Sequence, residues 1–238
     1  MPKRSSSTIP VRSAPKKDNH GLLVWSVIFL FCGVGLILAA AFFVQAGVGP
    51  VPGSGLPVAL RSDTPSSGFT LGQADAPLTI DIYEDFQCPV CRDWSQTIFP
   101  QLRDHEIAAG KVKLVFHDFA FIGPESAAAE RAAYAAANQG RFWDMWATLY
   151  ANQGTENSGA FSDARLRTMA DKLGLNLAKY DTDFASSAAA DWVSAGIADA
   201  AGHNITATPT LVIAGKAYSG VGTYSALQAA IATALAAP

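Results

Sequence analysis

Two cysteines, Cys88 and Cys91, stand at the boundary between a predicted strand at 78–83 and a predicted helix at 89–109. The strand is β-branched and apolar, and the helix opens with proline and is followed by glycine. This places the Cys88 sulfur at a helix N-terminus, where the macrodipole and free backbone N–H groups favour a thiolate. Cys91 follows one turn later, within reach to resolve a mixed disulfide. The spacing therefore indicates thiol–disulfide chemistry.

Three alternatives to this chemistry are a structural disulfide, an inert pair of thiols and half of a zinc site. A structural disulfide or an inert pair of thiols can stand anywhere in a fold, so neither accounts for the position of the two cysteines between a strand and a helix. A zinc site needs two more ligands, and His105, His117 and His203 show no paired spacing. Cys32 lies in an apolar segment near the N-terminus. We favour the redox interpretation and expect no metal.

Hydrophobic periodicity predicts the order β-α-β, a helical block, then β-β-α. The later elements are a strand at 111–117, helices over 125–202 with breaks at Gly140, 154–159 and Gly174, strands at 210–213 and 216–218, and a helix at 224–235. A strand, a crossover helix and a second strand form a parallel pair, beside which the hairpin adds antiparallel strands. The fold class is therefore α/β. An apolar set at helical spacing is expected in the core of the helical block: Trp143, Met145, Trp146 and Leu149.

The N-terminal part has a different character. Residues 22–44 carry no charge, and 23 residues form a helix of about 35 Å, enough for a hydrocarbon core of about 30 Å. Residues 1–21 are basic, so they are expected to stay cytoplasmic, with 22–46 as a single transmembrane signal-anchor. A cleaved secretory signal is the alternative, but the run exceeds the usual apolar length of about 7–15 residues. Both interpretations place the globular domain outside the cytoplasmic membrane.

Composition sets the remaining boundaries. Residues 47–68 are rich in glycine, proline and serine and are expected to form a flexible linker. The globular domain is then 69–238, with its helical insertion at about 124–203. The first 20 residues carry a net charge of +4 and the rest −7, in a chain whose total is −3. An acidic main domain argues against a nucleic-acid partner.

The sequence resembles the DsbA-type thioredoxin-fold family, in particular its membrane-anchored bacterial members. The motifs that carry the likeness are Phe86-Gln87-Cys88-Pro89-Val90-Cys91, Ala207-Thr208-Pro209-Thr210, His117-Asp118-Phe119 and Gln139-Gly140-Arg141-Phe142-Trp143. The resemblance implies a thioredoxin fold with an inserted α-helical domain. It also implies that Pro209 is a cis proline facing the cysteines and that the Thr208 backbone pairs with a substrate peptide. The redox group would be the Cys88–Cys91 disulfide, with no other cofactor.

Two departures from the family pattern concern the chemistry. Many relatives carry a buried glutamate six residues before the first cysteine, where this chain has Ile82. Either Asp81 or Glu84 then serves proton transfer, or water does; Asp85 also lies close to the motif. Between the cysteines, Pro89 and Val90 are expected to tune the redox potential. Valine stands where the best-known relative has histidine, and it cannot stabilise a thiolate through its side chain, so a milder oxidant is expected.

The predicted function is an extracytoplasmic thiol:disulfide oxidoreductase, membrane-anchored, that acts as a dithiol oxidase on the thiols of exported proteins. The resemblance implies reoxidation by a quinone-linked membrane partner of the DsbB or vitamin K epoxide reductase type. The extracytoplasmic location fits, since disulfides persist there. The alternatives are a disulfide reductase or isomerase of the cell envelope and a non-catalytic peptide-binding chaperone. His117 is expected to be structural.

Overall fold

The computed structural model describes residues 64–220 and 222–237. The predicted cytoplasmic segment 1–21, the predicted membrane anchor 22–46 and most of the predicted linker lie outside this range. Within the described part of the chain, no helix combines the length and the apolar character needed to cross a membrane.

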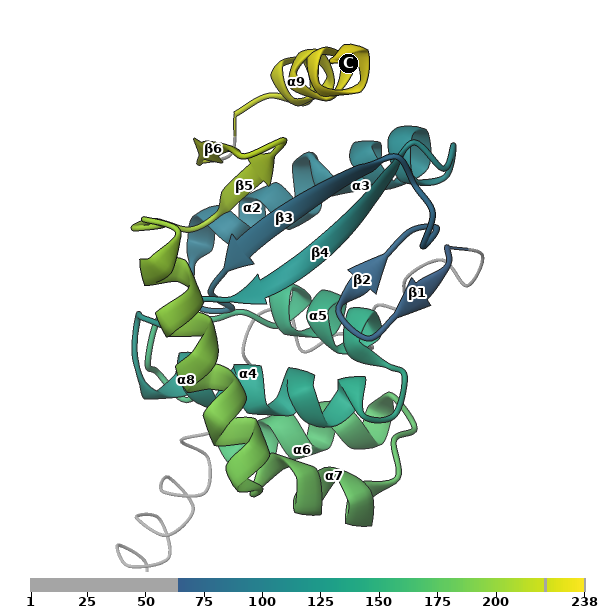
Figure 1. Ribbon diagram of the computed structural model, residues 1–238. Helices are drawn as coiled ribbons and strands as arrows, with labels where there is room; N and C mark the ends of the chain where they lie inside the picture. Colours follow the sequence, from purple (N-terminus) through teal and green to yellow (C-terminus); the bar gives the residue numbers. More distant parts are fainter. Residues whose placement is uncertain (1–63, 221, 238) are drawn as a thin grey trace, which may run out of the picture. The chain divides into compact units, whose positions relative to one another are not determined.

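The described strands form a six-stranded mixed sheet in the order β1-β2-β4-β3-β5-β6 (Figure 1). Their bounds are Ser66–Ser67, Thr70–Leu71, Leu78–Glu84, Val112–Asp118, Thr210–Ile213 and Lys216–Ser219 for β1 to β6. The predicted parallel pair is β3 and β4, and β5 runs antiparallel to β3. The sheet begins earlier than predicted, because β1, which lies within the predicted linker, pairs with β2.

Alternation along the central pair sorts its side chains onto two faces. Ile80, Ile82 and Glu84 of β3 pair in register with Leu114, Phe116 and Asp118 of β4, so all six share one buried face. Asp81, Tyr83 and His117 lie on the opposite face. The apolar face packs into the main core, which also contains both cysteines.

The predicted single helix over 89–109 is divided. It consists of α2 (Pro89–Thr97), the short α3 (Phe99–Leu102) and a π-helical turn, η1 (Arg103–Ile107). The break follows from Pro100, which has no N–H to donate to the preceding turn. In the same turn, the carbonyl oxygen of Thr97 accepts from the Gln101 side chain at 2.8 Å. The helix opening at Pro89 agrees with the prediction.

The helical insertion contains five helices, which gather on the lower side of the sheet in Figure 1. They are α4 (Pro124–Ala137), α5 (Phe142–Ala151), α6 (Asp163–Lys172), α7 (Leu177–Phe184) and α8 (Ser187–Gly202). Gly140 and Gly174 end helices in the left-handed conformation, at φ of 69° and 73°. The break between α7 and α8 was not predicted, since no glycine or proline marks it; there the Ser186 hydroxyl caps α8 by accepting from the Ala189 N–H. The predicted apolar set of α5 is buried as expected.

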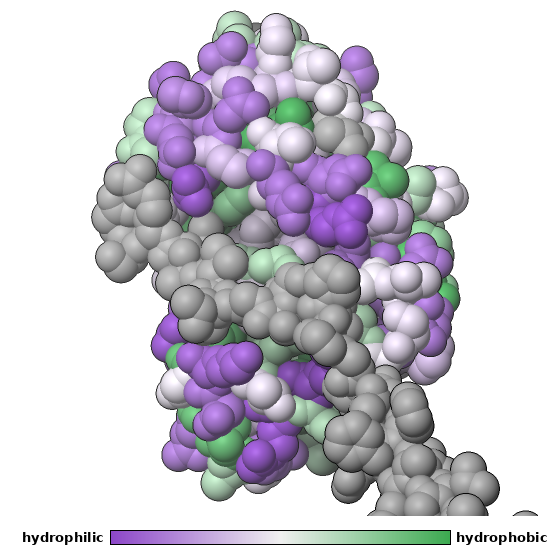
Figure 2. Space-filling model, turned by 180° about the vertical axis from the view of Figure 1, so that it is seen from behind, coloured by the Kyte–Doolittle hydropathy of each residue, from purple (hydrophilic) through white to green (hydrophobic). Residues whose placement is uncertain are grey.

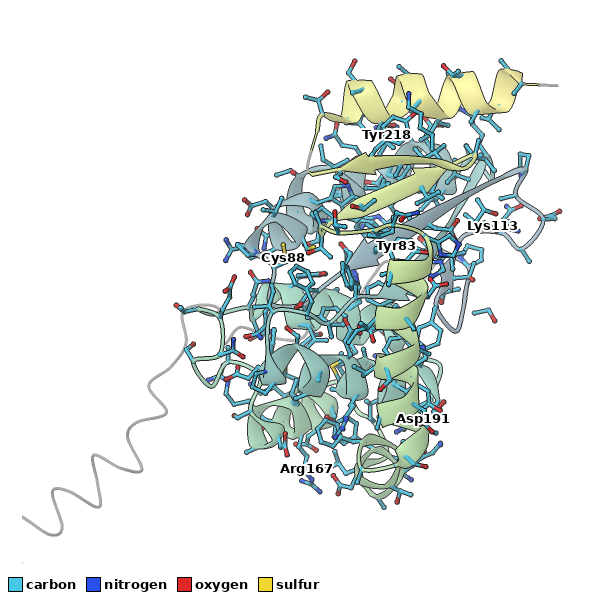
Figure 3. The ribbon with its side chains drawn as sticks, turned by 60° about the vertical axis from the view of Figure 1, so that its left-hand side comes forward. Tyr83, Cys88, Lys113, Arg167, Asp191 and Tyr218 are labelled. Carbon is cyan, nitrogen blue, oxygen red and sulfur yellow. The ribbon has the colours of Figure 1, made fainter. Side chains whose placement is uncertain are left out.

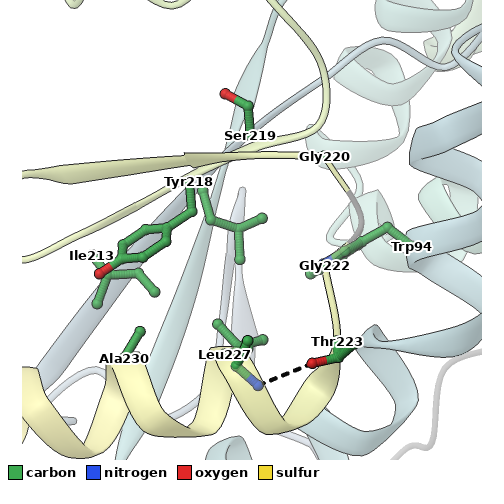
Figure 4. A pocket seen from close by; sticks show the side chains of 11 residues that line it. Trp94, Ile213, Tyr218, Ser219, Gly220, Gly222, Thr223, Leu227 and Ala230 are labelled. Atoms are coloured by element: carbon green, nitrogen blue, oxygen red, sulfur yellow. Dashed lines mark hydrogen bonds between the residues drawn. The ribbon is translucent and has the colours of Figure 1, made fainter.

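The last helix, α9 (Tyr224–Ala236), packs against β3 and β5. Its first turn is capped by the Thr223 hydroxyl, which accepts from the Ala226 N–H (Figure 4). Between α9 and the β5–β6 hairpin lies a cavity of about 360 Å³, mostly apolar in its lining, with Trp94 of α2 at its wall. On the face drawn in Figure 2, hydrophilic side chains predominate among the described residues and hydrophobic ones are scattered between them.

Candidate active site

Cys88 lies between the end of β3 and the first turn of α2 (Figure 3). It is the N-cap residue of α2, followed by Pro89 at the first helical position. Its backbone N–H donates to the Asp85 carbonyl oxygen at 2.9 Å, which closes the turn after the strand. Both cysteines are free thiols, with Cys88 6% exposed and Cys91 not exposed at all. Of the two cysteines, only Cys88 therefore has any surface exposed to solvent.

The two thiols differ in acidity. A hydrogen bond from the Cys91 thiol is the main cause that lowers the pKa of Cys88 to about 6, with smaller lowering contributions from Thr208 and from the backbone N–H groups of Val90 and Cys91. Burial raises the pKa of Cys91 well above its ordinary value, and its neighbours Cys88 and Glu84 raise it further. At neutral pH the accessible sulfur is mostly a thiolate and the buried one is a thiol.

The loop before β5 faces the first cysteine. The Thr208–Pro209 peptide bond is cis. The Cys88 sulfur lies 3.4 Å from the Thr208 carbonyl oxygen, 120 residues away in the sequence, and donates to it when protonated. The Pro209 carbonyl oxygen accepts from the Gly220 N–H. The fold thus brings Thr208 and Pro209 to the cysteines.

Glu84, at the end of β3, is buried beneath the motif. Its side chain is 0% exposed, and one carboxyl oxygen accepts from the Trp146 indole N–H at 2.7 Å. Burial raises the pKa of Glu84 to about 8, and the charge of Cys88 adds to the rise while the Trp146 hydrogen bond opposes it. Glu84 lies two residues beyond Ile82, the position of the family's glutamate. Because strand side chains alternate, a shift of two residues keeps the carboxyl on the same face of β3.

Asp81 occupies the other face. Its carboxylate pairs with His117 Nε2 at 2.9 Å, and Nδ1 of the same ring lies 3.3 Å from Asp199 of α8. Tyr83 donates to Asp199 as well, at 2.9 Å, and stacks on His117. Asp81 is therefore held away from the cysteines, contrary to its prediction as a proton-transfer candidate. His117 joins the sheet to α8, in keeping with a structural role.

Two buried polar residues that support the motif were not identified as such from the sequence. The carboxylate of Asp85 accepts from the backbone N–H groups of Gln87, Phe121 and Ile122 and from the Ser126 hydroxyl. Gln153, after α5, donates to the carbonyl oxygens of Phe86 and Cys88, at 2.7 and 3.0 Å. No local pattern marks Gln153, since its partners are more than 60 residues away.

The two residues between the cysteines are exposed. Val90 contributes its backbone N–H to Cys88 and nothing from its apolar side chain. Among residues 64–220 and 222–237, no three histidine, cysteine, aspartate or glutamate side chains are placed to hold a metal ion.

The difference in acidity predicts selective alkylation. In the reduced protein, iodoacetamide is expected to label Cys88 with a rate that reaches half its maximum near pH 6, following the pKa of about 6. Cys91 is expected to react at least about 100-fold more slowly at that pH, since it is both buried and protonated. Mass spectrometry of peptides after timed quenching measures both rates. Unfolding in guanidinium is the control and makes the rates similar; equal rates in the folded protein would contradict the assigned roles.

A mixed sheet with a Cys-Pro-Val-Cys motif before α2 and a cis-proline loop opposite it defines the protein as a thioredoxin-fold protein. A family model described as Thioredoxin matches residues 64–233. The chain belongs to this family, and within it to the DsbA-type thioredoxin-fold proteins.

Three similar proteins support this placement. The probable disulfide bond formation protein D of Bacillus cereus is 41% identical over 91 residues, which are 37% of this chain and 42% of that protein. The chain thus spans about two fifths of the length of the curated relatives of that name. The oxidised BdbD of Bacillus subtilis superposes with a TM-score of 0.67 at 24% identity, covering 73% of this chain and 97% of that one. DsbA2 of Pseudomonas aeruginosa gives 0.56 at 25% identity, covering 70% and 93%.

Proposed function

We propose that this protein is a thiol:disulfide oxidoreductase of the cell envelope that oxidises dithiols in exported proteins. The observation that carries the proposal is the unequal state of the two sulfurs. Cys88 has exposed surface, is ionised near neutral pH and lies next to the Thr208 carbonyl oxygen. Cys91 is fully buried and protonated. An attacking sulfur and a resolving sulfur require this asymmetry.

The reaction starts from the Cys88–Cys91 disulfide, the redox group of the protein. A substrate thiolate attacks the Cys88 sulfur, and the S–S bond breaks with Cys91 leaving. The second substrate thiolate then attacks the substrate sulfur of the mixed disulfide and releases Cys88 as a thiolate. Two electrons pass from the substrate dithiol to the protein dithiol, and no further cofactor takes part.

Cys91 is a poor leaving group as a thiolate, because burial raises its pKa. Glu84 is the group proposed to give it a proton. With a pKa of about 8, its carboxyl is mostly protonated at neutral pH. Thr208 and Pro209 would receive the substrate backbone, and the Thr208 carbonyl oxygen is free to accept from it because neither the Cys88 thiolate nor the disulfide has a hydrogen to donate.

The proposed setting is the outer side of the cytoplasmic membrane, with residues 22–46 as anchor. Exported proteins fold there, and their disulfides persist. The reduced pair would be reoxidised by a quinone-linked membrane protein of the DsbB or vitamin K epoxide reductase type. Support for the setting comes from the charge pattern of the N-terminal segment and from the family.

The reduction potential of the Cys88–Cys91 pair tests the direction of electron flow. A thiolate with a pKa near 6 stabilises the reduced form more than in thioredoxin, whose pKa is about 7, and less than in DsbA, at about 3.5. We expect a potential between about −270 and −120 mV, the values of those two proteins. Equilibration with glutathione buffers measures it, and a reduced, unfolded secretory protein reports oxidation directly.

A potential at or below that of thioredoxin, with no oxidation of the reduced protein, would favour the reductase or isomerase instead. Retention of peptide binding and of folding assistance after both cysteines are replaced by alanine would favour the chaperone. Either result would remove the oxidase proposal.

A further inference from the structure

Four carboxyl groups are buried together behind the cysteines: Glu84 and Asp85 at the end of β3, Asp118 at the end of β4 and Glu130 of α4. Each is at most 2% exposed. Four buried carboxylates cannot all be ionised at neutral pH, because each would repel the others in a region of low dielectric. Some of these groups must therefore hold protons.

Hydrogen bonding separates Asp85 from the other three. Its oxygens accept from three backbone N–H groups and one hydroxyl, which suits a carboxylate. By contrast, both oxygens of Glu130 and one oxygen each of Glu84 and Asp118 have no donor partner among the described residues. The unpaired oxygens are where protons can be held.

Asp118 connects Glu84 with Glu130. Glu84 and Asp118 are register partners in the parallel pair β3–β4, so their side chains are neighbours on one face of the sheet. Asp118 and Glu130 are close enough that each shifts the pKa of the other, and neither finds another donor for its unpaired oxygens among the described residues. Two neighbouring carboxyl groups can share a hydrogen bond only when one of them is protonated, so a single proton would serve the unpaired oxygens of both. The carboxyl groups of Glu84, Asp118 and Glu130 thus form a row in space that runs from beneath Cys91 into the helical insertion.

The neighbouring carboxyl groups of Asp118 and Glu130 are enclosed by the helical insertion. A methyl group at Gly196 of α8 would lie 2.5 Å from the Asp118 carbonyl oxygen and 2.8 Å from its Cβ, so the helix passes directly over this residue. The charged groups that act on Glu130 are Asp118, Asp85 and Glu84, all acidic. Burial raises the pKa of Asp118 to about 8 and raises that of Glu130 as well.

We propose that Asp118 and Glu130 form a proton-sharing pair that resupplies Glu84 with the proton it passes to Cys91. The proposal rests on the oxidoreductase function and deepens it. When the disulfide accepts two electrons from a substrate dithiol, the Cys91 sulfur leaves and takes the Glu84 proton. The shared proton of the pair then moves to the Glu84 carboxylate, and the pair is refilled from solvent. Reoxidation runs the transfers in reverse. Asp118 and Glu130 act through Glu84.

The test is a double-mutant cycle on the reduction of the oxidised protein by dithiothreitol. Tryptophan fluorescence follows the reaction in a stopped-flow instrument between pH 5 and 9. Glu130→Gln keeps the shape of the side chain and removes its titration, and we expect at least about tenfold slower reduction at pH 7 with an altered pH profile. In a Glu84→Gln background the same substitution is expected to change nothing further, since the proton has no route to Cys91.

Glu106→Gln is the matched control. Glu106 is 4% exposed and bound to Lys111, which immediately precedes β4, so it lies at the opposite end of that strand from Asp118. Its substitution is expected to leave the rate within twofold of wild type. An unchanged rate and pH profile in Glu130→Gln, or an equal loss with and without Glu84, would overturn the relay.

Infrared difference spectroscopy on the wild-type protein gives a readout that does not depend on a foldable variant. The oxidised-minus-reduced spectrum is expected to contain a carbonyl band of a protonated carboxyl group that shifts in deuterium oxide; a spectrum without one would contradict the proposal. Dithiothreitol also separates this test from that of the proposed function. A protein that reacts with dithiothreitol but oxidises no secretory protein would keep the relay and lose the oxidase role.

Discussion

Replacing Cys91 with alanine is expected to convert the protein from a turnover enzyme into a trap for its substrates. Cys88 keeps its exposed surface and, although it loses the Cys91 hydrogen bond that lowers its pKa, it still exchanges with substrate disulfides to form mixed disulfides, which no thiol beneath it can resolve. Replacing Cys88 with alanine is expected to abolish both oxidation and trapping, by at least about 1000-fold, because the remaining Cys91 is 0% exposed. Non-reducing electrophoresis of acid-quenched cells, followed by mass spectrometry, detects the trapped species.

Cys32→Ala is the matched control for this pair of variants, since it removes the third cysteine of the chain. Its oxidase rate and its pattern of mixed disulfides are expected to equal those of wild type. Mixed disulfides formed through Cys91 in the Cys88→Ala protein would show that the buried sulfur is reachable, and the assignment of attacking and resolving roles would fail.

The stability of the reduced protein is expected to fall as the pH rises from 5 to 8. Burial raises the pKa of Glu84 and of Asp118 to about 8 in the folded state, whereas both are near 4 in the unfolded chain. Between these values the folded protein holds protons that the unfolded chain has released, so each group weakens folding by about 1.4 kcal/mol per pH unit. Guanidinium unfolding at fixed pH, with excess reductant, measures the slope.

The Glu84→Gln variant isolates one of these protons, and its stability is expected to depend less on pH by about 1.4 kcal/mol per unit. Glu156→Gln makes the same chemical change in an exposed loop and should follow the wild-type slope. A Glu84→Gln slope equal to that of wild type would mean that Glu84 is ionised in the folded protein, and its role as proton donor would be withdrawn.

Much of the thioredoxin-like part was predictable because its signals are local. The β-branched run before the motif, the proline that opens α2 and the alternation of β4 each act within a few residues, and each predicted the element that the structure contains. The prediction of a single helix over 89–109 is wrong for a local reason too. Pro100 lies inside the predicted range, and a proline inside a helix interrupts its hydrogen bonding.

The candidate site was predictable only in part. The motif itself marks Cys88 and Cys91, but Glu84 stood among several acidic residues near a strand end, where most carboxylates are solvated. Its burial depends on Trp146, 62 residues later, which the periodicity of α5 identified only as core. Asp81 looked equally suitable until the register of β3 and β4 paired it with His117 on the other face.

The sequence by itself determined the order of the elements, the position of the two cysteines at the start of a helix and the alternation of side chains along β3. These depend on backbone preferences and hydrophobic spacing, which act between near neighbours. Only the tertiary structure decided how completely Cys91 is buried, which carboxyl lies beneath it and which carbonyl oxygen faces Cys88. Solvation and pKa are set by the groups that surround a side chain, and here Thr208, Trp146 and Glu130 come from distant parts of the chain.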